Sequence, residues 1–317
     1  MEKLPIISVV MSVYKEPLEW LRLSIDSILN QTFTDFEFII ICDNPQYNDG
    51  ISLLNEYAGQ DNRVKLLFNE VNIGLTKSLN IGLTIARGKY IARMDADDIA
   101  LDNRFEVQMD EFLKQENLGV CGACVECFGT INKIRIFPET KEKMFLFVEN
   151  CFAHSTIIAK RELMIKYKYN EECKHAQDYE LWFRMYNDGV KFYNVPKVLL
   201  KYRTSEQQIG ANFKGSQDAV GRHIRRASLV NYIRNNCGEF NFITDNVTKE
   251  DINKICHILA QSESYYQKLL FYLAISVDKK IDRLYLALFI IPIYHLSLRY
   301  YFHLCYYYLR NKRVRLF

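Results

Sequence analysis

Apolar runs alternate with amphipathic stretches along the first third of the chain. Four short runs rich in β-branched residues predict strands at residues 6–13, 36–42, 64–68 and 89–94. Between the first two runs, Pro17 can open a helix, whose apolar stripe is expected to stop at Asn30. Between the last two, a second stripe predicts a helix that Gly88 closes at its C-terminal end; its members are Leu75, Leu79, Leu83 and Ala86.

This alternation predicts βαβ units, and therefore an α/β fold with a mainly parallel sheet flanked by helices. Ligands of such sheets bind beside the carboxyl ends of the strands. Polar residues follow all four predicted strands: Tyr14-Lys15-Glu16, Asp43-Asn44, Asn69 to Asn72 with Gly74, and Asp95 to Asp98. We expect these residues to line one crevice.

Three carboxylates, Asp95, Asp97 and Asp98, follow the fourth strand within four residues. Such a cluster repels itself unless a cation neutralises it. Mg²⁺ and Mn²⁺ prefer oxygen ligands, and Mg²⁺ commonly binds one or two carboxylates together with substrate phosphates. The cluster therefore indicates a metal-bridged diphosphate. The alternative is a solvated acidic turn in which Asp97 or Asp98 caps a helix.

Five segments carry a family resemblance: Ser8 to Tyr14, Asn72 to Leu75, Asn80 to Gly82, Ala86 to Ile91, and Asp95 to Asp98. Together they resemble the family 2 glycosyltransferases, which have the GT-A fold, a Rossmann-like α/β architecture. The resemblance extends over about residues 5 to 205. It implies an enzyme that binds a nucleotide diphosphate sugar, usually a UDP-sugar, through Mn²⁺ or Mg²⁺. It also implies that the sugar is transferred with inversion at the anomeric carbon.

The resemblance places the donor nucleotide beside the residues after the first two strands, here Tyr14 and Asp43. Glu16 is a further candidate next to Tyr14. Family members often continue from this position as Asp-Asp-Gly-Ser, whereas Asp43 is followed by Asn44-Pro45-Gln46. The contacts to the base are therefore expected to differ from those of other members.

The acidic cluster matches the Asp-x-Asp pair of the family. By this resemblance Asp97 is the first choice as metal ligand, and Asp95 is expected to bind the donor ribose or the metal. Asp98 is expected to hold the loop instead.

A second chemical signal lies downstream, where Asp178, Leu181, Trp182 and Met185 recur at helical spacing. This spacing places the carboxylate on the inward face of a helix, in its first turn. Taken alone, the position favours helix capping or an interaction with the helix dipole. The segment also resembles the family's Asp-Tyr-x-Leu-Trp stretch. That resemblance implies that Asp178 is the general base for the acceptor hydroxyl.

Three side chains are cationic candidates for stabilising the leaving diphosphate: His154, Arg184 and Arg203. His154 lies in a segment that resembles one near the donor and acceptor, and Tyr202-Arg203 matches a family pair. The alternatives are a hydrogen-bonded structural histidine and a surface salt bridge of Arg203.

Cysteine usage raises one further possibility, because Cys121, Cys124 and Cys127 have the spacing of an iron–sulfur or zinc site. A fourth ligand is missing, so a buried strand over residues 120–128 is the preferred interpretation. No secretory signal precedes the first strand. Free thiols without such a signal favour the reducing cytoplasm.

The C-terminal region, residues 216–317, is expected to be helical and separate from a catalytic domain at 1–215. Its tail from residue 279 contains eight Lys or Arg and one Asp, a net charge of +7 in a chain whose total is +3. Aromatic residues are interleaved with these bases. We therefore expect peripheral binding to anionic lipid at the inner face of the cell membrane. The alternative is a helical cap on the catalytic domain or on a second subunit.

Three functions remain open at this level. The first is a metal-dependent inverting glycosyltransferase that builds cell-surface polysaccharide or lipid-linked glycan. The second is a sugar-nucleotide nucleotidyltransferase, although the glycine-rich phosphate loop expected after its first strand is absent. The third is an inactive nucleotide-binding scaffold. No nucleic-acid partner is expected.

Overall fold

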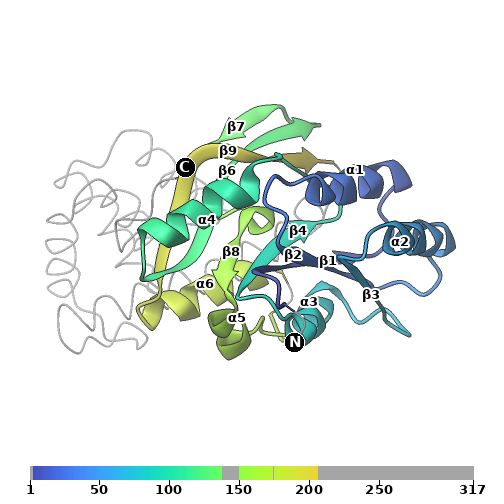
Figure 1. Cartoon of the computed structure of the whole chain (residues 1–317), viewed down its shortest axis with the longest axis horizontal. Coiled ribbons are helices and arrows are strands. Elements are labelled where there is room, and N and C mark those ends of the chain that lie inside the picture. Colours follow the sequence, from blue (N-terminus) through green and yellow to red (C-terminus); the bar gives the residue numbers. More distant parts are fainter. Residues whose placement is uncertain (1–2, 138–149, 174, 206–317) are drawn as a thin grey trace, which may run out of the picture. The chain divides into compact units, whose positions relative to one another are not determined.

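The four predicted strands form one half of a nine-stranded sheet (Figure 1). The computed structural model describes residues 3–137, 150–173 and 175–205. The strands lie within one residue of their predicted bounds, as β1 Ile7–Val13, β2 Phe36–Cys42, β3 Val64–Phe68 and β4 Tyr90–Asp95. The prediction of these strands from their apolar runs is therefore confirmed.

The sheet has the strand order β3-β2-β1-β4-β8-β6-β9-β5, and β7 pairs with β6. The remaining strands are β5 Ile99–Ala100, β6 Leu118–Gly129, β7 Lys133–Arg135, β8 Ile158–Lys160 and β9 Lys191–Thr204. Strands β3, β2, β1 and β4 run parallel, as do β6 and β9. Strand β8 joins these two groups antiparallel to both β4 and β6. The predicted mainly parallel sheet is thus confirmed, with antiparallel additions beyond β4.

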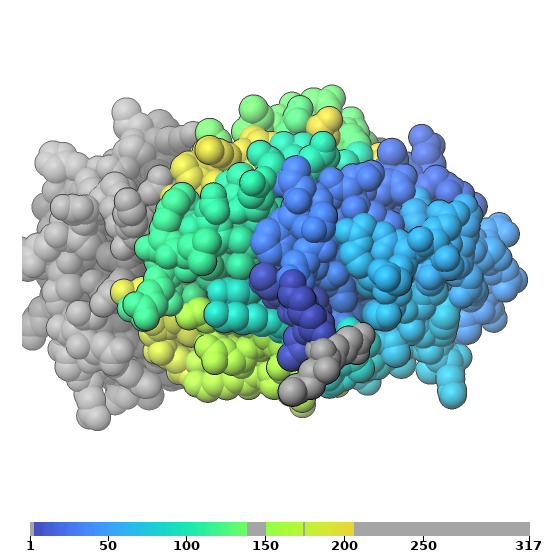
Figure 2. Space-filling view, viewed as in Figure 1, coloured from blue at the N-terminus to red at the C-terminus, as the bar shows by residue number. Residues whose placement is uncertain are grey.

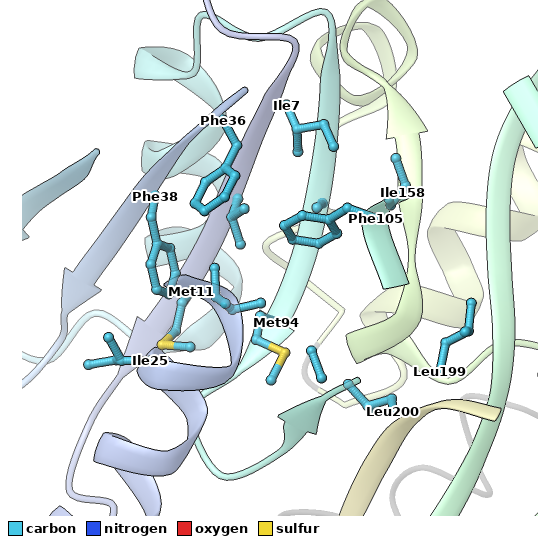
Figure 3. Packing of buried hydrophobic residues seen from close by; sticks show 14 of the residues in the cluster. Ile7, Met11, Ile25, Phe36, Phe38, Met94, Phe105, Ile158, Leu199 and Leu200 are labelled. Carbon is cyan, nitrogen blue, oxygen red and sulfur yellow. The ribbon is translucent and has the colours of Figure 1, made fainter. Parts of the chain in front are cut away.

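Helices cover both faces of this sheet (Figure 1). They are α1 Leu18–Leu29, α2 Asn48–Gln60, α3 Leu75–Ile85, α4 Arg104–Lys114, α5 Arg161–Tyr167 and α6 Gln177–Asn187. Buried side chains of α1, α2 and α4 share one hydrophobic cluster with Met11 and Phe38 (Figure 3). Because successive strand residues point to opposite faces, the neighbouring Val10 faces the other layer, where α3 packs.

In the space-filling view most of the blue residues occupy the right side, and most of the green and yellow-green ones lie to their left and above them (Figure 2). The strand order changes direction between β1 and β4, because β2 and β3 extend the sheet one way and later strands extend it the other. Such a switch point is where open α/β sheets bind ligands.

The helix starts and stops were predicted with one error. Pro17 precedes α1, and α1 ends at Leu29, as predicted. Helix α3, however, is not closed by Gly88 in the left-handed conformation, because it ends at Ile85 and the chain turns extended at Ala86. Gly88 is needed for a different reason. A Cβ there would lie 2.5 Å from the backbone nitrogen of Ser8, so only glycine lets this segment pass against β1.

The predicted C-terminal region, its domain boundary at residues 215/216 and its basic aromatic tail lie outside the described residues. These expectations therefore stay predictions. Within the described ranges, none of the helices has both the length and the apolar character needed to cross a bilayer.

Candidate functional site

Strands β1, β2 and β4 end side by side at one edge of the sheet. Val13 pairs with Cys42 across β1 and β2, and Ser12 pairs with Asp95 across β1 and β4. The polar residues that follow these strands therefore emerge at the same edge, at the switch point where open α/β sheets bind ligands.

Asp43, predicted to bind the donor nucleotide, is buried and holds the loop before α3. Its Oδ1 accepts hydrogen bonds from the Asn69 amide side chain (2.8 Å) and the Ile73 backbone N–H (2.9 Å). Its Oδ2 accepts one from the Gly74 N–H (2.8 Å). Gly74 has a φ of +87°, which glycine adopts easily, and it begins α3. Asp43 thus shapes this edge of the crevice through the loop.

Asp95 is paired on both of its oxygens. Arg93 lies two residues earlier on the same face of β4 and donates to Oδ1 over 2.5 Å. The Ser155 hydroxyl donates to Oδ2 over 2.5 Å. Burial acts to raise the pKa of Asp95, but the charge of Arg93 and the Ser155 hydrogen bond act against it, and that pKa lies below its usual range. Asp95 is therefore kept ionised.

Asp98 holds the acidic loop, as predicted. The backbone N–H of Arg203 in β9 donates to its Oδ1 over 2.8 Å, while its buried Oδ2 has no hydrogen-bond partner among the described residues. Burial, reinforced by the charges of Asp97 and Asp95, raises the pKa of Asp98 well above its usual value. Asp98 therefore ionises less readily than Asp95.

Arg203 lies directly against this loop. Its Nε donates to the backbone carbonyl of Asp97 over 2.8 Å, and its guanidinium lies 4.4 Å from the ring centre of Trp20 and 4.5 Å from that of Phe128. Stacking on two rings holds a guanidinium in one orientation. Arg203 therefore binds a backbone carbonyl of the acidic loop and two aromatic faces.

Glu16 belongs to the same charged group. Burial raises the pKa of Glu16, and the carboxylates of Asp97 and Asp95 raise it further, although the backbone N–H of Tyr14 donates to it over 2.8 Å. The Tyr47 hydroxyl donates to the Glu16 carbonyl and ties this segment to the start of α2. The Tyr14 side chain itself is 40% exposed and is accessible to a ligand.

The oxygen-rich donor set fits a hard divalent cation shared with a ligand. Among the described residues, no three His, Cys, Asp or Glu side chains form a complete metal site. Mg²⁺ often needs only one or two carboxylates when phosphates supply other ligands. Burial is the main cause of the raised pKa values of Glu16 and Asp98, and the charges of Asp97 and Asp95 raise both further. Such a cation would relieve that repulsion. Asp95 already accepts two short hydrogen bonds, from Arg93 and Ser155.

Asp178 lies in the first turn of α6, as predicted, and is half-buried. The residues that share its helical face are fully buried: Leu181, Trp182 and Met185. The side-chain amide of Asn150 donates to its Oδ2 over 2.7 Å. The helix begins after Ala176, whose φ of +60° is unusual for a residue with a Cβ. The carboxylate is thus placed by strained backbone, buried neighbours and one hydrogen bond.

His154 opens the 3₁₀ turn η2, His154–Thr156, between the two groups of carboxylates. Its Nε2 lies 2.8 Å from the Tyr169 hydroxyl, and the two rings meet edge to face at 5.5 Å. It also meets the Trp182 ring edge-on at 6.4 Å. The hydrogen-bonded histidine predicted as the alternative is confirmed, in a position next to the site.

Electrostatics connect His154 to both carboxylate groups. Burial and the charge of Arg93 lower the pKa of His154 to about 4, while the carboxylates of Asp178 and Asp95 act in the opposite direction. The imidazole is therefore neutral near pH 7. The turn contacts both segments directly, because Ser155 donates to Asp95 at the end of β4 and the His154 ring meets Trp182 of α6.

Arg184 has a different role from the one predicted. Its guanidinium forms a double hydrogen bond with Glu180, at 2.7 and 2.9 Å. It also donates to the backbone carbonyls of Tyr167 and Lys168 at the end of α5. These four hydrogen bonds join α6 to α5 and do not point to a role at the leaving diphosphate.

Sequence reasoning missed four residues of this site: Arg93, Ser155, Asn150 and Tyr169. Only Arg93 had a local signal. It is a charged residue inside an otherwise apolar strand, two positions before Asp95 and hence on the same face. Ser155 and Asn150 contact the carboxylates, and Tyr169 contacts His154, across segments distant in sequence, which no local pattern reveals.

The cysteine-rich stretch is the buried strand that was preferred on sequence. Cys121, Cys124 and Cys127 are buried free thiols of β6. Cys121 and Cys127 belong to the main hydrophobic cluster, whereas Cys124 accepts a hydrogen bond from the Phe137 N–H. A spacing of three on a strand alternates between faces, so this spacing does not bring the three thiols together.

Comparison with known protein families decides between the three functions. A family model described as "Glycosyl transferase family 2" matches residues 8–178, which is more than half of the chain. The chain belongs to glycosyltransferase family 2. The match begins in β1 and ends at Asp178, so this glycosyltransferase contains both carboxylate groups within its family region.

The sequences of two relatives align with much of the length of this glycosyltransferase. An uncharacterised glycosyltransferase of Methanocaldococcus jannaschii is 38% identical over 205 residues, which are 63% of this chain and 71% of the relative. The O-antigen biosynthesis glycosyltransferase WbnJ of Escherichia coli is 30% identical over 240 residues, 73% of this chain and 93% of WbnJ.

Solved structures confirm the predicted fold. S. aureus TarS, residues 1–349 in complex with UDP-GlcNAc, superposes with a TM-score of 0.59 at 15% identity, covering 98% of this chain and 93% of TarS. At this identity the likeness concerns the fold alone. The α/β architecture expected of a GT-A glycosyltransferase is thereby confirmed.

Proposed function

We propose that this glycosyltransferase moves a sugar from a UDP-sugar to a hydroxyl of a glycan or lipid-linked glycan acceptor, with inversion at the anomeric carbon. Two parts of the site divide the work. The donor half comprises Tyr14, Glu16, Asp43 and residues 95–98 at the strand ends. The acceptor half comprises residues 150–156 with Tyr169 and Asp178.

One observation carries this proposal, namely that the turn His154–Thr156 contacts both the end of β4 and helix α6, which are far apart in sequence. The Ser155 hydroxyl donates to Asp95, and the His154 ring meets the ring of Trp182, one helical turn after Asp178. An inverting transfer needs a nucleotide site and a base at one reacting centre, because the acceptor attacks opposite the leaving group. This arrangement supports that chemistry.

In the acceptor half, Asp178 takes the proton from the acceptor hydroxyl as its oxygen attacks the anomeric carbon. One oxygen of Asp178 accepts a hydrogen bond from the Asn150 side-chain amide, and this bond fixes the plane of the carboxylate. A fixed carboxylate is a more effective base because less motion precedes proton transfer. His154, neutral at physiological pH, adds a hydrogen-bonding group without adding charge.

In the donor half, the leaving diphosphate gains negative charge as the bond to the sugar breaks. A divalent cation, Mn²⁺ or Mg²⁺, held mainly by Asp97 and also by Asp95, would neutralise that charge when bound. Arg203 holds the loop of Asp97 through its backbone carbonyl. Tyr14, exposed beside Glu16, is assigned to the nucleoside, and Asp43 supports the loop that borders it.

The class of acceptor is proposed from two lines of support. The relative WbnJ is named for O-antigen biosynthesis, so we extend cell-surface polysaccharide synthesis to this chain. The basic aromatic tail, with its net charge of +7, favours an anionic membrane surface. Both point to work at the cytoplasmic face of the cell membrane, where a lipid-linked acceptor would be presented.

Calorimetric titration of the full-length protein with UDP, with and without Mn²⁺, tests the donor assignment. Hydrolysis of a panel of UDP-sugars then identifies the sugar. Metal-dependent UDP binding together with slow hydrolysis of one sugar is the expected result. No binding of UDP, with binding of GDP or dTDP instead, would change the nucleotide. No binding of any of the three would contradict the proposal and favour an inactive scaffold.

A further inference from the structure

Helix α3 contributes one buried polar side chain, Asn80, whose hydrogen bonds all reach toward the acceptor half. Its Oδ1 accepts the backbone N–H of Tyr169 (3.0 Å), and its Nδ2 donates to the Tyr169 carbonyl (2.9 Å) and to Glu171 Oε1 (3.0 Å). Asn80 is only 8% exposed. A carboxamide has one acceptor oxygen and two donor hydrogens. Both the oxygen and the amide nitrogen of Asn80 therefore form hydrogen bonds with the segment that follows α5.

That segment is strained at both ends. Lys168 has a φ of +47°, and His175 and Ala176 have φ values of +77° and +60°. Residues with a Cβ persist in this region only where surrounding structure holds them. Asn80 binds Tyr169, the residue immediately after the first strained position, and α6 with Asp178 begins immediately after the last. The hydrogen bonds of Asn80 therefore anchor a segment that leads to the base.

Tyr169 connects Asn80 to His154. Its ring is buried, at 4% exposure, and its hydroxyl lies 2.8 Å from Nε2 of His154. The Trp182 ring, one helical turn after Asp178, lies edge-on to the same imidazole. His154 is thus fixed by one hydrogen bond and two ring contacts.

We propose that Asn80 and Tyr169 are positioning residues for sugar transfer: Asn80 fixes the backbone of Tyr169, and the Tyr169 hydroxyl fixes the His154 ring beside Asp178. This inference rests on the proposed function, because it assigns these residues to the acceptor side of that reaction. These hydrogen bonds link α3 to the His154 ring. Helix α3 begins at the donor loop that Asp43 holds.

Two substitutions test the two steps in the full-length protein. Asn80→Asp keeps an acceptor for the Tyr169 N–H but loses both donated hydrogen bonds and repels Glu171. Tyr169→Phe removes only the hydroxyl. We expect each to lower kcat for UDP-sugar hydrolysis about tenfold or more, with KM for the sugar nucleotide and Kd for UDP changed less than about twofold. The combined variant is expected to be no slower than the slower single variant, because both act through His154.

Tyr167→Phe is the matched control. The Tyr167 hydroxyl also forms a short hydrogen bond, to Asp188 at 2.5 Å. Tyr167 lies two residues before Tyr169 in the sequence and outside the proposed site. We expect kcat for this variant to equal that of the wild-type protein.

Wild-type kcat in Asn80→Asp and Tyr169→Phe would overturn the inference. So would loss of UDP affinity in parallel with kcat, since that result describes general damage to the fold. A wild-type protein that hydrolyses no nucleotide sugar would instead contradict the proposed function. Positioning is then tested alone by the NMR signals of the His154 ring, and unchanged signals in both variants would overturn it.

Discussion

The donor and acceptor halves of the site are built in different ways. In the donor half, each functional residue follows a buried strand directly, so the sheet fixes its place: Asp43 follows β2, and Asp95 ends β4. In the acceptor half, His154 lies in a three-residue turn, and Asp178 follows two residues with positive φ. Regular strands therefore position the donor half, whereas side-chain hydrogen bonds position the acceptor half.

This difference teaches where variation can be tolerated. Strand register changes only if every residue of the strand changes face, so the position of the donor loops is robust. The acceptor half depends on single contacts, such as Asn150 with Asp178 and Tyr169 with His154. We therefore expect substitutions in the donor half to act on ligand binding and substitutions in the acceptor half to act on turnover.

The largest effect is expected for Asp178→Asn. Loss of a general base lowers rates by about 10²- to 10⁴-fold, so kcat should fall by that factor while Kd for UDP is retained. Single-turnover transfer and calorimetry measure the two quantities. Asp188→Asn, an equivalent change just past the other end of α6, serves as control. Near-normal turnover of the Asp178 variant would remove it as the base.

The fold was largely predictable because its information is local. Apolar runs predicted β1 to β4 almost to the residue, since β1, β2 and β4 are buried on both faces. Strand β3, at the end of the strand order, is only partly buried, but its run is also apolar. The error at Gly88 arose because sequence does not show that β1 passes within contact distance of that backbone. The need for glycine was correct, but its physical cause was a close approach between segments.

The candidate site was predictable only in part. Asp97 and Asp178 could be selected from their motifs, but motifs do not show partners. Arg184 was misjudged because nothing in its local sequence shows that its guanidinium binds the end of α5. Asn150 was missed because its contact to Asp178 spans 28 residues.

The second largest effect concerns pH and the acceptor half. The pKa of His154 is about 4 in the folded protein and about 6.5 in the unfolded chain. As pH falls from 6.5 towards 4, the unfolded chain binds a proton that the folded protein does not, so stability is lost in that window. The loss is at most about 3 kcal/mol at its acid end.

Denaturant unfolding at pH 7.5 and at pH 5, for the wild-type protein and for His154→Gln, isolates this contribution. Glutamine can still bond the Tyr169 hydroxyl but does not titrate. The wild-type protein should lose more stability on acidification than the variant, because all other titrating groups are common to both. Equal losses would show that His154 titrates normally.

A smaller effect is expected in the donor half for Asp97→Ala. Loss of the main proposed carboxylate ligand should weaken UDP binding in the presence of Mn²⁺ by about 10- to 100-fold, while the affinity for UDP without metal is unchanged. Titration with UDP at fixed Mn²⁺ measures it. Asp102→Ala, an exposed carboxylate in the following turn, is the control. Metal-dependent affinity equal to the wild-type value would exclude Asp97 as ligand.

The smallest effect is expected for Asn150→Ala, which removes one hydrogen bond from the base and leaves the carboxylate in place. A hydrogen bond to a charged group contributes about 1.5–3 kcal/mol, and partial replacement by water at this half-buried position reduces the loss to about tenfold in kcat. Asn170→Ala removes an exposed amide whose oxygen accepts only a local backbone hydrogen bond, and it should leave kcat unchanged. If Asn150→Ala instead weakened UDP binding and spared kcat, the division between a binding half and a turnover half would be wrong, because a contact on Asp178 would then be acting on the donor.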